Sequence, residues 1–281
     1  MATTPTALDA DWLTLCRRAV DGLDEILAAA PTTVQRARET GTRGSGGDRT
    51  LEIDSSAETV VFEQLQALHD HGHRFRAVSE ERGEVDFGGE DVVVIIDPID
   101  GSLNAKRDAC HYALSVAVAD GPTMADVAFG FVYDFGAHEQ WWARRGEGAW
   151  RDGTQLDRSL RERRSRDGRL ELMGIESSDP RSVQAAIEPL AITARRLRAL
   201  GTIASTLCQV AAARFDAMVT LQRSRGVDAA AGQLIVREGG GFVSFPDRAQ
   251  PLDAPLDATA SSHLVAARSA ETLRELEALP W

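Results

Sequence analysis

The sequence contains very little cysteine. Only Cys16, Cys110 and Cys208 occur among its 281 residues, and no two of them form a Cys-x-x-Cys pair. An odd number of widely spaced cysteines argues against a disulfide framework, and the missing pairs argue against a zinc ribbon. Because free thiols persist where the environment is reducing, the sequence favours a reducing compartment.

Long apolar runs are missing as well. No stretch approaches the roughly 18 uninterrupted apolar residues that a membrane-spanning helix needs. The first residues, Met1–Pro5, carry neither the basic nor the apolar segment of a secretory leader. From these absences we expect a cytoplasmic protein with no membrane partner.

Positive charge is also in short supply. The chain has 31 basic and 43 acidic residues, which gives a formal net charge of -12, and Lys106 is its only lysine. Such a charge balance argues against nucleic acid as a partner. A phosphorylated substrate would need local positive charge, which bound divalent metal ions could supply.

The composition is otherwise that of an ordinary globular protein, with 43% apolar and 26% charged residues. Helical spacing of apolar residues predicts a helix over about residues 9–30. A second helix is predicted to begin at Ser55–Glu58, which has the pattern of a capping box, and to end at Gly72. Between the two helices, Gly41–Asp48 is too rich in glycine for regular structure, so we expect a flexible loop that could act as a lid.

Apolar and β-branched runs in the first half predict strands at residues 75–78, 92–96, 113–119, 127–133 and 139–143. In the second half, strands are predicted near 170–175 and 217–221, and helices near 182–190, 205–213 and 227–238. Arginine-rich residues 158–169 separate the halves and show no apolar periodicity. We therefore predict two subdomains, 1–160 and 161–281, with helices layered against two sheets.

The most informative motif is the hexapeptide Asp97-Pro98-Ile99-Asp100-Gly101-Ser102, which follows the apolar run 92–96. Proline has no amide hydrogen with which to continue a β-ladder, so the strand is predicted to stop at Asp97. The two aspartates then leave the sheet edge together, and hard cations prefer such carboxylate oxygens. Gly101 permits an unusual backbone angle, and Ser102 can open a helix whose amides would bind a phosphate. A turn whose aspartates only cap a helix is the structural alternative.

Two other segments supply acids in similar positions. Glu80 and Glu81 follow a predicted strand, and Asp228 stands at the start of a predicted helix. Alone, Asp228 could be a helix cap and the glutamates a solvated loop, but beside the hexapeptide they indicate one metal cluster. The histidine-rich segment His69–His73 has no second ligand group at a zinc spacing, so we expect an exposed turn there.

In these residues the chain resembles the inositol monophosphatase family, within the lithium-sensitive, magnesium-dependent phosphatase superfamily that includes the fructose-1,6-bisphosphatases. The resemblance spans nearly the whole chain. Its motifs are Asp97–Ser102, Glu80-Glu81, Leu200-Gly201-Thr202 and Asp228–Gly232. It implies an α+β fold, a layered αβαβα sandwich, and a phosphoric monoester hydrolase that uses about two or three Mg²⁺ ions per active site.

The resemblance also implies a role for each matching residue. The expected metal ligands are Glu80, Asp97, Asp100, Asp228 and the backbone carbonyl of Ile99, with Asp97 bridging two ions. Ser102 matches the hydroxyl that helps to activate water, and Glu81 and Asp48 are the acids expected to orient that water or to receive its proton. The expected substrate contacts are Asp100, Gly101, Ser102, Thr202, Arg225 and Asp228.

Substrate choice depends on features beyond the hexapeptide. Gly47–Asp54 and Arg225 are similar to archaeal-type members with both inositol phosphatase and fructose bisphosphatase activity. Leu221 and Val227 stand where other members have an inositol-binding glutamate and a tryptophan. We expect inositol 1-phosphate first, with fructose 1,6-bisphosphate, histidinol phosphate and 3′-phosphoadenosine 5′-phosphate as alternatives.

A function of another class stays open. Some bacterial relatives work with the transcription machinery, and the arginines of residues 158–169 could serve an RNA- or polymerase-binding regulator. A solvated connection explains the same residues. The family further implies a homodimer, which the sequence itself does not indicate.

Overall fold

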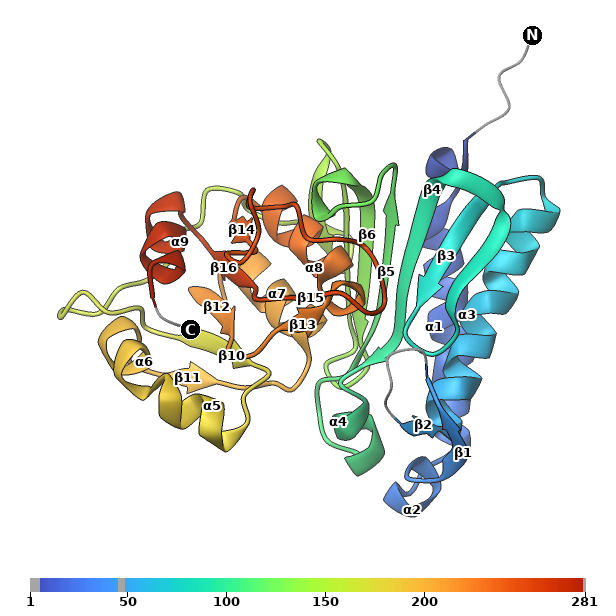
Figure 1. Ribbon diagram of the computed structural model, residues 1–281, viewed down its shortest axis with the longest axis horizontal. Coiled ribbons are helices and arrows are strands. Elements are labelled where there is room, and N and C mark those ends of the chain that lie inside the picture. Colours follow the sequence, from blue (N-terminus) through green and yellow to red (C-terminus); the bar gives the residue numbers. More distant parts are fainter. Residues whose placement is uncertain (1–5, 45–48, 280–281) are drawn as a thin grey trace, which may run out of the picture.

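The computed structural model describes residues 6–44 and 49–279 and arranges them in alternating layers of helix and sheet (Figure 1). The first sheet has seven strands in the order β3-β4-β5-β6-β7-β8-β9, and the second has five in the order β11-β10-β12-β16-β14. Helices α1 and α3 cover the outer face of the first sheet, and α7 and α8 lie between the sheets. Helices α5, α6 and α9 cover the far side of the second sheet. This confirms the predicted α+β sandwich with αβαβα layers.

The N-terminal half supplies the first sheet and its outer helices. The helices are α1 (Trp12–Ala29), α2 (Thr33–Arg36), α3 (Glu52–Asp70) and α4 (Ser102–Arg107), with 3₁₀ turns at Ala7–Asp9 and Met124–Asp126. The strands are β1 (Glu39–Arg43), β2 (Arg49–Leu51), β3 (Phe75–Ser79), β4 (Gly83–Asp100), β5 (Ala113–Ala119), β6 (Val127–Asp134), β7 (Glu139–Arg144), β8 (Gly148–Arg151) and β9 (Thr154–Gln155).

The C-terminal half supplies the second sheet and the helices around it. The helices are α5 (Pro180–Ala185), α6 (Ile187–Thr193), α7 (Ile203–Ala211), α8 (Gly226–Glu238) and α9 (Ala270–Glu277). The strands are β10 (Met173–Glu176), β11 (Leu197–Arg198), β12 (Ala217–Thr220), β13 (Ser224–Arg225), β14 (Phe242–Ser244), β15 (Ser261–Ser262) and β16 (Val265–Ala267). The proposed boundary at residue 160 falls between β9 and β10 and stays a prediction.

Helix α8 is buried on nearly every side because both sheets pack against it. Residues 226–236 are all buried, which suits their mostly small and apolar side chains. A Cβ atom on Gly130 of β6 would lie 2.8 Å from the carbonyl oxygen of Ala231, so the absent side chain lets helix and sheet approach closely. The packing therefore sets the position of Asp228 in the first turn of α8.

Several predicted element boundaries are wrong. Strand β4 begins at Gly83 instead of residue 92, and the helix predicted near 182–190 is two helices, α5 and α6. Helix α3 begins at Glu52 instead of Ser55, and Glu58 accepts hydrogen bonds from Ser79 and Arg82 instead of closing a capping box. Residues 41–43 belong to β1, which pairs with β2, because backbone pairing outweighs their glycine content. Strand β4 continues to Asp100 across an irregularity after Asp97, because Asp100 pairs again with Ala113.

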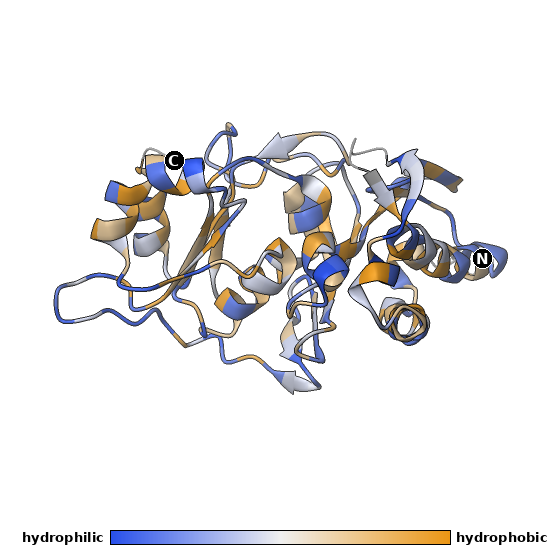
Figure 2. Cartoon of the chain, turned by 90° about the horizontal axis from the view of Figure 1, so that it is seen from below, coloured by the Kyte–Doolittle hydropathy of each residue, from blue (hydrophilic) through white to orange (hydrophobic). Residues whose placement is uncertain are grey.

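The connection from β9 to β10 contains the arginine-rich residues 158–169 and extends outward as a hydrophilic loop (Figures 1 and 2). Several of its arginines are held by nearby acids. Arg164 lies 2.7 Å from Glu275, and Arg169 lies 2.7 Å from Asp167. Within residues 6–44 and 49–279, no helix is both long enough and apolar enough to cross a membrane.

Candidate active site

The register of two strands brings the first pair of acids together. Strand β3 pairs in parallel with residues 93–96 of β4, so that Ser79 lies opposite Ile96. The next residues along the two chains, Glu80 and Asp97, therefore lie side by side at the same end of the sheet. The sequence predicts each strand separately, whereas their pairing explains why the two carboxylates meet.

Asp228 completes a compact acidic cluster. One carboxylate oxygen from each of Glu80, Asp97 and Asp228 lies within 4.8 Å of the others. Asp97 is 2% exposed and Asp228 8% exposed. Like charges buried this closely repel one another unless protons or cations compensate them. The geometry thus fits a cation site.

Asp100 is held beside this cluster by the start of helix α7. Its Oδ2 accepts hydrogen bonds from the Thr202 hydroxyl at 2.5 Å and from the Ala204 amide at 2.7 Å. Thr202 is 1% exposed, and it also caps α7. Its hydroxyl therefore contacts a predicted metal ligand, and its predicted contact with substrate stays a prediction.

Burial and mutual repulsion raise the pKa of each aspartate in the cluster. Burial, with Glu80, Asp100 and Asp228 nearby, raises the pKa of Asp97 well above its usual value. Burial and the charge of Asp228 likewise raise the pKa of Asp100, although the hydrogen bonds from Thr202 and Ala204 act to lower it. Burial raises the pKa of Asp228 to about 6, although Arg225 opposes the shift.

Glu80 and Asp97 open into a cavity of about 100 Å³, which is lined by part of the hexapeptide as well. Its lining consists of Asp54, Glu80, Glu81, Asp97, Pro98, Ile99, Ser102 and Arg225. Ser102 is exposed and begins α4, after Gly101 at a φ of 90°. A Cβ on Gly101 would lie 3.0 Å from the Gly201 carbonyl oxygen, so a side chain there would crowd the turn that presents Ser102.

Asp54 belongs to this cavity, although no sequence motif predicted a role for it. It is 8% exposed, and its Oδ1 is buried without a hydrogen-bond partner. Burial, with the charges of Glu81 and Glu80, raises its pKa to about 7. Its position on the buried face of α3, one turn before the buried Glu58, is the signal that could have identified it. An acid on the apolar face of an amphipathic helix calls for a specific reason.

The glycine-rich hairpin lies over Glu81. The Thr50 hydroxyl on β2 donates to Glu81 Oε2 at 2.5 Å. A Cβ on Gly44 would meet the same oxygen, so a side chain there would require the Glu81 carboxylate to move. Burial raises the pKa of Glu81. Asp48, the other predicted acid of this loop, lies outside the described residues.

A buried glutamate supports the loop in front of α7. Glu176 accepts hydrogen bonds from the amides of Leu200 and Gly201 at 2.8 and 3.0 Å, and from the Thr206 hydroxyl at 2.6 Å. This loop leads into Thr202, which contacts Asp100. No motif in the sequence marks Glu176, because only the fold places strand β10 beside the loop.

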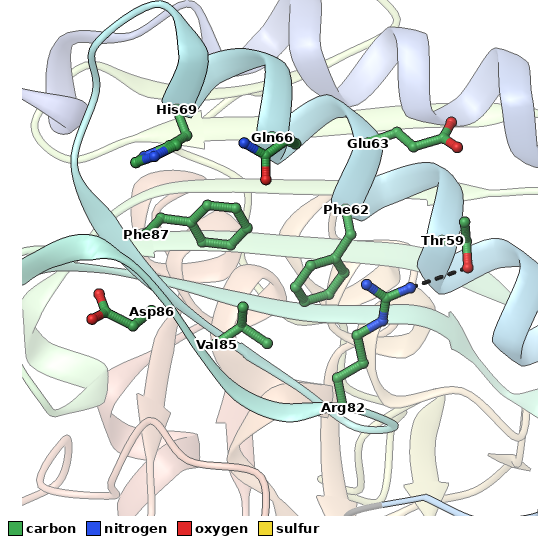
Figure 3. Close-up of a pocket in the computed structure, with 9 residues that line it drawn as sticks. All are labelled: Thr59, Phe62, Glu63, Gln66, His69, Arg82, Val85, Asp86 and Phe87. Carbon is green, nitrogen blue, oxygen red and sulfur yellow. Dashed lines mark hydrogen bonds between the residues drawn. The ribbon is translucent and has the colours of Figure 1, made fainter.

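A larger cavity lies away from the acids. It measures about 360 Å³ between α3 and the hairpin of β3 and β4, and Phe62 and Phe87 contribute apolar rings to it. Figure 3 shows its two acids, Glu63 and Asp86, at opposite ends. Size alone would favour this cavity, but the chemistry of the carboxylate cavity makes that one the candidate active site.

Comparison with known protein families gives one match over nearly the whole chain. The sequence profile described as the inositol monophosphatase family matches residues 13–279. The chain belongs to the inositol monophosphatase family. This inositol monophosphatase-family protein is therefore a phosphatase that hydrolyses phosphate monoesters, as members of this metal-dependent family do.

Individual relatives carry different names. The chain is 32% identical over 239 residues to a fructose-1,6-bisphosphatase/inositol-1-monophosphatase of Methanothermobacter thermautotrophicus, covering 81% of this chain and 82% of the relative. It is 32% identical over 212 residues to the Nus factor SuhB of Escherichia coli K12, covering 74% and 75%. A solved Thermotoga maritima IMPase matches with a TM-score of 0.71 and 25% identity, over 95% of this chain and 97% of that one.

The acidic residues fit the metal that this family requires. Asp228 Oδ1 is buried without a hydrogen-bond partner, and a buried oxygen of this kind suits an ion as its missing partner. All three members of the cluster offer oxygen, the ligand atom that Mg²⁺ prefers.

Proposed function

We propose that this phosphatase hydrolyses a small polyol or sugar phosphate, inositol 1-phosphate first, with the help of Mg²⁺. The observation that carries the proposal is the cluster of Glu80, Asp97 and Asp228, whose oxygens lie within 4.8 Å of one another beside Ser102. The proposed ligands are these three residues together with Asp100 and the carbonyl of Ile99. Bound Mg²⁺ would neutralise phosphate charge and lower the pKa of a water molecule.

The chain's own residues would position the substrate and move the proton. The amides of Gly101 and Ser102 open α4 at the cavity and can hold phosphate oxygens. The Ser102 hydroxyl would orient the attacking water. Asp54 and Glu81 line the same cavity with raised pKa values, which suits groups that take a proton near neutral pH. Asp54 thus joins Glu81 as a candidate base, and Asp48 stays a prediction.

Fructose 1,6-bisphosphate is the closest rival substrate. Arg225 adds a guanidinium to the cavity, and such a group can bind a second phosphate. Leu221 is buried, at 7% exposure, and cannot donate or accept a hydrogen bond to a ring hydroxyl through its side chain. Both features support a substrate recognised by charge.

The experiment that tests the proposal is phosphate release by the full chain with Mg²⁺, with and without Li⁺. The substrates are inositol 1-phosphate, fructose 1,6-bisphosphate, histidinol phosphate and 3′-phosphoadenosine 5′-phosphate. We expect Mg²⁺-dependent, Li⁺-inhibited release, fastest from inositol 1-phosphate. A preference for the nucleotide would overturn the substrate assignment, and release that persists in EDTA would overturn the role of Mg²⁺.

The metal-free protein should lose stability as the pH rises. The pKa of Asp54 is raised to about 7 and that of Asp228 to about 6, from a usual 3.8. Because the folded-state values exceed the unfolded ones, these groups stabilise the fold fully below about pH 4 and lose that contribution as the pH rises to about 7. In EDTA, we therefore expect Tm to fall between about pH 5 and pH 8.

Added Mg²⁺ should reverse that loss, because an ion that binds only the folded state stabilises it. We expect Mg²⁺ to raise Tm strongly at about pH 8 and only slightly at about pH 5, where protons already compensate the carboxylates. Differential scanning fluorimetry measures both effects. An increase of equal size at the two pH values would contradict the assignment of these acids as ligands.

A regulatory function is the second candidate, since a relative is named Nus factor SuhB. The arginines of residues 158–169 would then form the contact, although Arg164 and Arg169 already have acidic partners. Salt-sensitive RNA binding that survives Asp97→Asn would support this function, whereas no binding at low salt would remove it. The predicted homodimer can be tested by light scattering.

A further inference from the structure

Arg225 places a permanent positive charge among the proposed metal ligands. Its Nη1 lies 2.6 Å from Glu80 Oε1, and its Nη2 lies 3.6 Å from Asp228 Oδ1. Its side chain is 25% exposed and lines the carboxylate cavity. Because a guanidinium does not lose its proton in proteins, this charge is present at every working pH.

The guanidinium compensates the acids without saturating their oxygens. Its contact with Glu80 is a hydrogen bond, but 3.6 Å is too long for one to Asp228. Asp228 Oδ1 thus stays buried without a hydrogen-bond partner. A bare Mg²⁺ ion approaches a carboxylate oxygen to about 2.0–2.1 Å and carries twice the charge. A divalent cation would therefore satisfy these oxygens better than Arg225 does.

Only the side chain of Arg225 needs to move for such an ion to enter. The backbone is held because β13 pairs with β15, with Arg225 opposite Ser261. The cavity that Arg225 lines gives its flexible side chain space to leave Glu80. The exchange therefore requires no change of fold.

We propose that Arg225 is a displaceable counter-ion, which compensates Glu80 and Asp228 in the metal-free protein and leaves them when a divalent cation binds. The inference rests on the proposed function, because it takes these carboxylates as metal ligands. Metal binding is then an exchange of cations. Arg225 weakens the affinity for the ion and, in return, stabilises the metal-free cluster.

The test compares Arg225→Gln with a matched control, Arg223→Gln, in the chain of 281 residues. Both variants remove one positive charge from the same segment, but Arg223 is 59% exposed and pairs with Asp247. Isothermal titration with Mg²⁺ alone measures affinity, and electron paramagnetic resonance with Mn²⁺ provides a second reading. We expect Arg225→Gln to bind at least ~10-fold more tightly than the wild type, and Arg223→Gln to bind as the wild type does. The Mg²⁺ affinity of Arg225→Lys should lie between that of the wild type and that of Arg225→Gln.

Thermal unfolding separates a counter-ion from a merely structural residue. In EDTA at about pH 8, Arg225→Gln should lose at least ~3 °C in Tm, and saturating Mg²⁺ should remove most of that loss. Unchanged or weaker Mg²⁺ affinity in Arg225→Gln would overturn the inference, as would an equal loss of Tm with and without Mg²⁺. If the wild type itself binds no Mg²⁺, the proposed function fails instead.

Discussion

Replacing Asp97 with asparagine should lower Mg²⁺-dependent phosphate release by at least ~10³-fold, about 4 kcal/mol of transition-state stabilisation. Asp97 is 2% exposed and lies between Glu80, Asp100 and Asp228. Asparagine keeps the shape of the side chain but carries no charge and offers one oxygen instead of two, so it would hold a divalent cation much more weakly. A phosphate-release assay with inositol 1-phosphate measures the loss.

The same variant should not be less stable without metal. Burial and the neighbouring acids raise the pKa of Asp97, so a neutral side chain relieves repulsion. In EDTA at about pH 8, we expect the Tm of Asp97→Asn to equal or exceed that of the wild type. Asp91→Asn is the matched control, because Asp91 is exposed on the same strand. Full activity in Asp97→Asn would refute the assignment of Asp97 as a metal ligand.

Replacing Asp54 with asparagine should lower kcat by about 10²–10⁴-fold, the usual contribution of a positioned base. Asp54 lines the carboxylate cavity, its Oδ1 has no hydrogen-bond partner, and its pKa is raised to about 7. An asparagine there cannot take a proton from water. Steady-state kinetics at saturating Mg²⁺ measures the change in kcat.

Mg²⁺ affinity distinguishes a base from a ligand at Asp54. As a base, its replacement should change the affinity only a few-fold, because Asp54 lies outside the cluster of Glu80, Asp97 and Asp228. Glu52→Gln is the matched control, since Glu52 is exposed in the same first turn of α3. A loss of Mg²⁺ binding as severe as that of Asp97→Asn would make Asp54 a ligand and contradict its role as a base.

Much of the fold and of the candidate site could be predicted from the charge balance, the strand patterns and the residues of the turns. The apolar run before Asp97 and the glycine at position 101 are local signals, and the central part of β4 and the start of α4 follow from them. Pro98 wrongly predicted the end of the strand, because Asp100 pairs again with Ala113. The strands before Glu80 and the helix at Asp228 are local in the same way. The fold class was recognisable because these motifs occur together in one family.

Prediction was wrong or silent where contacts distant in sequence decide the outcome. Glycine content suggested a loop at 41–43, but pairing with β2 makes that segment a strand. Glu58 was predicted to close a capping box. Instead it is 3% exposed and accepts a hydrogen bond from the backbone amide of Arg82, in the hairpin that follows the helix. Asp54 and Glu176 looked like ordinary acids, because nothing in their neighbours in the sequence reveals what the fold places against them.

By itself, the sequence determined the chemistry of this protein: oxygen ligands at a strand end, a glycine turn that presents a hydroxyl, and an excess of acid. Only the tertiary structure decided which of these groups meet. The parallel register of β3 on β4 puts Glu80 beside Asp97, and the close packing of α8 brings Asp228 to them. The tertiary structure also places the Arg225 guanidinium next to Glu80 and Asp228. The physical reason is that backbone and side-chain preferences act over a few residues, whereas burial and charge act between segments that only the packed fold brings together.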